Sequence, residues 1–84
     1  GPAATAVIGR DLGENDERQD YLRSTLGFDE AGDLVATPFD KQDSSMMANF
    51  ARADCLVIRA PHAPAISKGS RVEIIPLMGS MLSI

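Results

Sequence analysis

Two short apolar runs joined by an acidic turn constrain this chain more than any other feature. In residues 21–28 the side chains alternate, with Leu22, Leu26 and Phe28 on one side of an extended strand. Residues 29–33 supply turn chemistry, including a glycine that can adopt a positive φ angle. Residues 34–39 form the returning strand. The sequence therefore predicts a β-hairpin, and Pro38, which has no N–H to donate, places the end of that strand at an edge or outside the sheet.

The other apolar runs are equally short. They predict strands at residues 5–10, 55–59 and 71–77, and one amphipathic helix at residues 43–52, whose apolar side chains recur every three or four positions. Strands and helices do not alternate along the chain, which excludes a doubly wound sheet. We expect a mainly β fold, a small incomplete barrel of about five to six short strands with one short helix plugging it.

Composition excludes several classes of partner. The 84-residue chain is one small domain with a thin core. Its net charge is −4 and no dense basic patch occurs, which argues against nucleic-acid binding. No apolar stretch approaches the roughly 20 residues of a membrane span, so no membrane partner is expected. The single cysteine, Cys55, lies in a predicted buried strand and is expected to be an unreactive thiol of a cytoplasmic protein.

Catalytic chemistry is scarce in this sequence. His62 is the only histidine and lies in a proline-flanked loop, with nothing to indicate a nucleophile and an orienting carboxylate beside it. One histidine and one cysteine cannot form a structural zinc site, and no glycine-rich phosphate loop precedes a helix. We predict no catalytic residue and no metal site.

One segment has the composition of an anion site. Residues 41–45 place a lysine, an amide, a carboxylate and two hydroxyls at the start of the predicted helix. Backbone N–H groups there are unsatisfied and carry the positive end of the helix dipole, so with Lys41 they can bind phosphate or another oxyanion. The alternative is that Asp43 or Ser44 simply caps the helix while Lys41 is solvated.

The same segment carries a family resemblance. Residues 20–23, 35–47 and 52–59, followed by 61–65 and 69–74, together resemble the last domain of MoeA-type molybdopterin molybdenumtransferases. The middle segment, with Gln42 and the paired serines, is the specific part. Residues 1–4, which begin with Gly-Pro, are expected to be a tag remnant. The resemblance makes residues 5–77 the MoeA C-terminal β-domain and leaves residues 78–84 as a tail.

The resemblance implies a β-clip-like barrel and a role in molybdenum cofactor biosynthesis. Enzymes of this family are transferases that insert molybdate into adenylylated molybdopterin with magnesium and release AMP. Their active cleft lies between this domain and the central domain of the second subunit of a homodimer. The central domain has no counterpart in these 84 residues, so we expect the chain alone to be inactive, with the other domains and a second subunit as partners. Gephyrin, a relative, uses the corresponding domain to dock proteins, so a protein-interaction β-module is the alternative function.

Position in the family domain implies a set of ligand-binding, cleft-facing residues: Arg18, Arg23, Lys41, Gln42 and Ser44. Arginine suits bidentate contact with phosphate or oxyanions, and amide and hydroxyl groups can donate to the same oxygens. For the two arginines the alternative is surface ion pairing with Glu17 or Asp20. Asp43 is assigned a capping role only.

Overall fold

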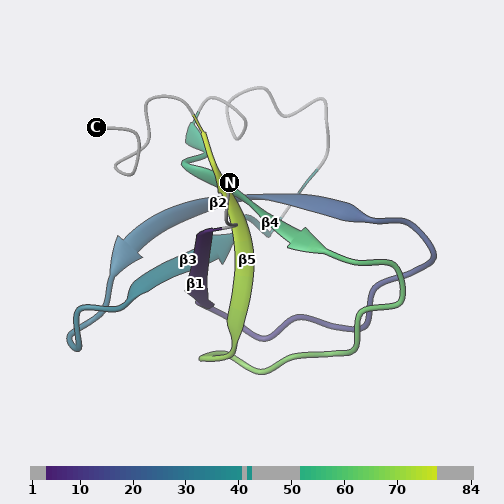
Figure 1. Ribbon diagram of the computed structural model, residues 1–84, viewed down its shortest axis with the longest axis horizontal. Coiled ribbons are helices and arrows are strands. Elements are labelled where there is room, and N and C mark those ends of the chain that lie inside the picture. The colour runs from purple at the N-terminus through teal and green to yellow at the C-terminus, as the bar shows by residue number, and fades with distance from the viewer. Residues whose placement is uncertain (1–3, 41, 43–51, 78–84) are drawn as a thin grey trace.

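The protein is a closed five-stranded barrel in the computed structural model (Figure 1). The structure describes residues 4–40, 42 and 52–77. Its strands are β1 (Ala4–Ile8), β2 (Asp20–Phe28), β3 (Leu34–Pro38), β4 (Cys55–Arg59) and β5 (Arg71–Pro76). The mainly β prediction is confirmed, although the barrel is closed and not incomplete. The predicted helix lies outside the described residues, except for Arg52 at its end.

The predicted hairpin is present. β2 pairs antiparallel with β3, from Ser24 opposite Pro38 to Phe28 opposite Leu34. β3 ends at Pro38, which has no N–H to donate, although the N–H of the next residue, Phe39, still donates to the carbonyl of Arg23. The first half of β2 pairs with β4 instead, so this long strand joins the hairpin to the rest of the barrel.

An Asp side chain organises the hairpin turn. The Oδ1 atom of Asp29 accepts hydrogen bonds from the N–H groups of Ala31 at 3.0 Å and Asp33 at 2.9 Å. Gly32 has a φ of 86°, a left-handed conformation that glycine adopts without steric cost. The turn chemistry recognised in the sequence is therefore the chemistry that the fold uses.

Closure depends on β1, which lies between β3 and β5. It runs parallel to β3, with Val7 opposite Val35, and antiparallel to β5, with Ala4 opposite Ile74. Sequence patterning did not predict the parallel pair, and this pair converts an open ribbon into a barrel. A closed barrel leaves no unpaired sheet edge.

Gly9, directly after β1, allows the chain to lie close to β3. Its N–H donates to the carbonyl of Ala36 at 2.8 Å, which extends the β1–β3 contact beyond the strand. A Cβ atom at Gly9 would lie 2.1 Å from Oγ1 of Thr37, so no larger residue fits without displacing the threonine.

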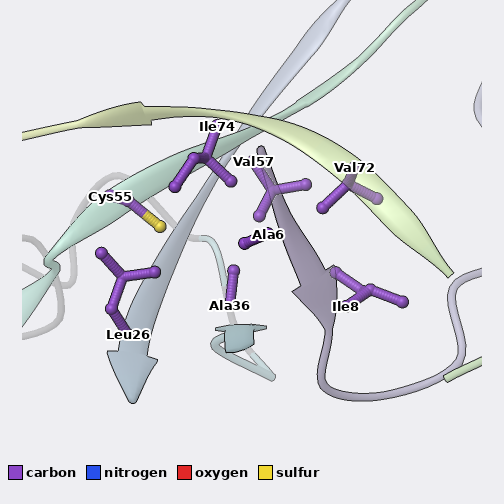
Figure 2. Close-up of a cluster of buried hydrophobic side chains, with 8 residues drawn as sticks. All are labelled: Ala6, Ile8, Leu26, Ala36, Cys55, Val57, Val72 and Ile74. Atoms are coloured by element: carbon purple, nitrogen blue, oxygen red, sulfur yellow. The ribbon is translucent and has the colours of Figure 1, made fainter. Parts of the chain in front are cut away.

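The core cluster consists of aliphatic side chains and one cysteine (Figure 2). Its buried members are Ala6, Ile8, Leu26, Ala36, Cys55, Val57, Val72 and Ile74. A barrel of few strands has a narrow interior, which favours such residues over aromatic ones. Cys55 is fully buried, as predicted; burial, with a smaller effect from the charge of Asp54, raises the pKa of its thiol to about 12.

The alternation predicted for β2 holds except at its end. Leu22 packs against the core, and Ser24 and Leu26 are buried. Phe28, expected on the same side, is 64 % exposed because it lies at the last position of β2, beyond the barrel interior.

Within the described residues no helix is long and apolar enough to cross a membrane.

Candidate functional site

The segment after β3 is held against β2 by the side chain of Gln42. Its Oε1 accepts a hydrogen bond from the N–H of Arg23 at 2.8 Å, and its Nε2 donates to the carbonyl of Arg23 at 2.9 Å. The same Nε2 donates to the carbonyl of Phe39 at 3.1 Å, and the N–H of Phe39 donates to the carbonyl of Arg23 at 3.0 Å. The Gln42 amide thus extends the pairing with β2 past Pro38, beside the backbone hydrogen bond of Phe39.

Three guanidinium groups surround this segment, and we call Arg10, Arg23 and Arg52 the arginine cluster. Arg10 donates from Nε to the carbonyl of Pro38 at 3.1 Å and from Nη2 to that of Phe39 at 3.0 Å. Arg23 donates from Nη2 to the carbonyl of Gln42. The guanidinium carbon of Arg52 lies 5.4 Å from the centroid of the Phe39 ring, within cation–π range.

The cluster concentrates positive charge around the segment that follows β3. The carbonyls that hold Arg10 are neutral, so they orient its guanidinium without cancelling its charge. Arg52 is exposed, and its contact with a ring face leaves its N–H groups available to a ligand. Such an arrangement suits an anion with several oxygen atoms, since guanidinium groups bind phosphate-like groups through paired hydrogen bonds.

The structure brings together two of the residues predicted for ligand binding and separates a third. Arg23 and Gln42 are in direct contact. Arg18 is exposed and precedes β2, five positions from Arg23, which is about 16 Å along an extended chain. Lys41 and Ser44 lie outside the described residues. Ligand binding by all five residues stays a prediction.

Sequence reasoning missed Arg10, Phe39 and Arg52. The acceptors of Arg10 lie 28 and 29 positions further along the chain, and no local pattern reveals a contact at such separation. Arg52 was assigned only to the end of a helix. The one signal in the sequence was the run of polar residues after Pro38. It identified this segment but not the arginine residues around it.

A buried arginine joins two long connections at another part of the barrel. Arg59 is 6 % exposed, and its Nη2 donates to the carbonyls of Gly13 at 2.6 Å and Pro64 at 2.9 Å. The connection between β1 and β2 runs beside that between β4 and β5 (Figure 1), where Leu12 and Ile66 form a β-bridge. We call these two connections the paired loops.

His62 belongs to the paired loops. It is exposed and has a φ of 59°, and its N–H donates to the carbonyl of Asp16 at 2.7 Å. Its backbone therefore helps to hold the loops together, while its side chain makes no hydrogen bond with a described residue. Nothing in this geometry assembles a histidine base with a nucleophile.

Metal binding does not fit the described part of the chain. No group of three or more His, Cys, Asp or Glu side chains within it is arranged to hold an ion. Carboxylate oxygens are the ligands that magnesium prefers, and the arginine cluster offers only donors and positive charge. These residues are therefore unsuited to holding magnesium.

The fold and the cluster together define a small β-barrel domain that presents an anion-attracting surface without an assembled catalytic group among its described residues. The sequence matches the family model described as the MoeA C-terminal region (domain IV) over residues 5–77. Because the match covers most of the chain, the protein belongs to this family, and the resemblance noted from residues 35–47 is confirmed. It is therefore a domain of a MoeA-type enzyme of molybdenum cofactor biosynthesis. A search of curated proteins found no match.

Proposed function

We propose that this domain forms one wall of the cleft in which molybdate is inserted into adenylylated molybdopterin, and that it has no turnover by itself. The observation that carries the proposal is the arginine cluster around the segment containing Phe39 and Gln42. Molybdate and the phosphate groups of the substrate are anions with several oxygens, the chemistry that guanidinium groups recognise.

Different members of the cluster have different roles in this proposal. Both amide atoms of Gln42 are engaged with the backbone, so Gln42 positions the segment. Arg10 holds the segment from the other side through two carbonyls. Arg52 is exposed and is the described residue best placed to contact a ligand. The resemblance adds Lys41 and Ser44 from the same stretch of sequence.

The rest of the chemistry is assigned to other parts of the enzyme. Magnesium, when bound, neutralises negative charge on phosphate oxygens, and its ligands are expected in the central domain. From the resemblance we also propose that the working form is a cytoplasmic homodimer in which this domain faces the central domain of the other subunit.

The test joins this domain to the other MoeA domains and measures molybdate-dependent AMP release. Arg52→Gln should raise the KM or lower the turnover by about 10- to 150-fold, the equivalent of a charge-assisted hydrogen bond of about 1.5–3 kcal/mol. Arg71→Gln is the matched control, because Arg71 is exposed at the first position of β5 and its side chain donates only to Oγ1 of Thr5 at 3.3 Å. Equal activities of the two variants would refute the assignment of the cluster.

A protein-interaction module of the gephyrin type is the second candidate function. It is favoured by the exposed Tyr21 (49 %) and Ile75 (40 %) and by the exposed loop around Pro61. Under this function, a folded fusion would show no molybdate insertion, and Tyr21→Ala would weaken binding of a partner protein. If the fusion inserts molybdate, the enzyme role stands.

A further inference from the structure

Phe39 is a large apolar side chain that the core cluster does not include. It directly follows β3 and is half-buried, and it is neither one of the buried core residues nor one of the described side chains packed against them. Burial of apolar area in the core is the usual role of a phenylalanine in a small domain. The place of this ring outside the core therefore points to a different role.

The backbone of Phe39 is fixed by three hydrogen bonds. Its N–H donates to the carbonyl of Arg23 at 3.0 Å, and its carbonyl accepts from Nη2 of Arg10 at 3.0 Å and from Nε2 of Gln42 at 3.1 Å. Nε of Arg10 also holds the preceding carbonyl, that of Pro38, at 3.1 Å. These bonds come from three separate parts of the chain, so they fix the direction in which the Phe39 side chain leaves the backbone.

The face of the Phe39 ring holds the guanidinium group of Arg52. The guanidinium carbon lies 5.4 Å from the ring centroid, and the negative charge of the ring face attracts a cation placed over it. Among the described residues no carboxylate forms an ion pair with Arg52. An exposed arginine without a partner samples many rotamers, and a ligand that fixes it must offset the lost entropy. A ring that already holds the guanidinium lowers this cost before the ligand arrives.

We propose that Phe39 is a positioning residue, whose ring pre-orients the guanidinium of Arg52 for an oxyanion, either molybdate or a phosphate group of the substrate. This inference rests on the proposed function, in which Arg52 contacts that anion. Arg10 and Gln42 hold the backbone of Phe39, the ring holds Arg52, and Arg52 donates to the oxygens of the ligand. Phe39 makes no contact with the ligand itself.

The first test replaces Phe39 in the enzyme joined to its other domains, with molybdate and adenylylated molybdopterin varied separately. Phe39→Leu keeps an apolar side chain but removes the ring face. It should lower kcat/KM about 2- to 5-fold, the equivalent of one exposed cation–π contact, for the same substrate that Arg52→Gln affects. Phe39→Tyr is the matched control, because it retains the ring face and should keep kcat/KM at the original value.

Coupling to Arg52 separates positioning from an effect on folding. In an enzyme that already carries Arg52→Gln, Phe39→Leu should lower kcat/KM no further, because no guanidinium remains for the ring to hold. A fluorinated phenylalanine at position 39 keeps the testing possible if Phe39→Leu does not fold. It nearly preserves the shape of the ring but withdraws negative charge from its face, so it should lower kcat/KM only while Arg52 is present.

A spectroscopic measurement on the 84-residue chain tests the contact without any activity. The ring current of Phe39 should shift the side-chain NMR signals of Arg52 upfield, and the shift should vanish in Phe39→Leu and persist in Phe39→Tyr. Absence of this shift in the unmodified chain overturns the inference. So does a kcat/KM that Arg52→Gln lowers but Phe39→Leu does not, that Phe39→Tyr also lowers, or that Phe39→Leu lowers equally without Arg52. If Arg52→Gln itself has no effect, the proposed function fails first, and the role of Phe39 in binding fails with it.

Discussion

Replacing Arg59 by methionine should destabilise the barrel and loosen the paired loops. Methionine keeps an unbranched apolar stem but removes the guanidinium that donates to Gly13 at 2.6 Å and to Pro64 at 2.9 Å. A hydrogen bond from a charged group contributes about 1.5–3 kcal/mol, and the two exposed acceptor residues regain water when the donor is lost. We therefore expect Arg59→Met to lower the free energy of unfolding by about 2–3 kcal/mol, out of a total of about 4–13 kcal/mol for a chain of this length.

The assay combines urea denaturation with amide hydrogen exchange. The N–H groups of Leu12 and Ile66 bond across the loops at 3.0 and 2.9 Å, so their protection should fall more than that of the core amides of the barrel. Arg18→Met is the control, since Arg18 is exposed and its side chain makes no hydrogen bond with a described residue. A loss of stability below about 0.5 kcal/mol, or an equal loss of protection everywhere, would show that Arg59 does not hold the loops.

Three further predictions concern the barrel seam, the thiol and the segment after β3. Gly9→Ala should cost about 1–3 kcal/mol of unfolding free energy in urea, because its Cβ would lie 2.1 Å from Oγ1 of Thr37, and Thr37→Ala should recover part of that loss. Raising the pH above 9 should destabilise the fold, since the unfolded thiol of Cys55 ionises near 9.0 and the folded one only near 12; the loss is about 1.4 kcal/mol at pH 10 and is absent in Cys55→Ala. In the joined enzyme, Lys41→Ala should leave the melting temperature nearly unchanged while slowing turnover about 10- to 150-fold. Asp43→Ala should instead cost about 1 kcal/mol of stability and affect turnover less, and a turnover unchanged by Lys41→Ala would make this segment purely structural.

The candidate site was only partly accessible from the sequence. The family resemblance drew attention to Arg23 and Gln42, but not to the hydrogen bonds through which one positions the other. Arg10 and Arg52 join them only because β1, β3, β2 and β4 are neighbours in the barrel. Contacts between residues many positions apart leave no periodic pattern, so side-chain type alone could not identify them.

What the sequence by itself determined is local. Alternation in residues 21–28 and the turn chemistry of residues 29–33 specified the hairpin, because side-chain direction and φ preference act over a few neighbouring residues. The run beginning at Cys55 specified a buried strand for the same reason.

The tertiary structure alone decided how the strands close. The parallel pairing of Val7 with Val35 joins segments 28 positions apart, and its stability comes from side chains that all the strands bury together. It also decided that Phe28 faces solvent, because its exposure depends on where β2 passes the rim of the barrel. Local preferences select strands and turns, whereas closure and the arginine cluster depend on which distant surfaces meet.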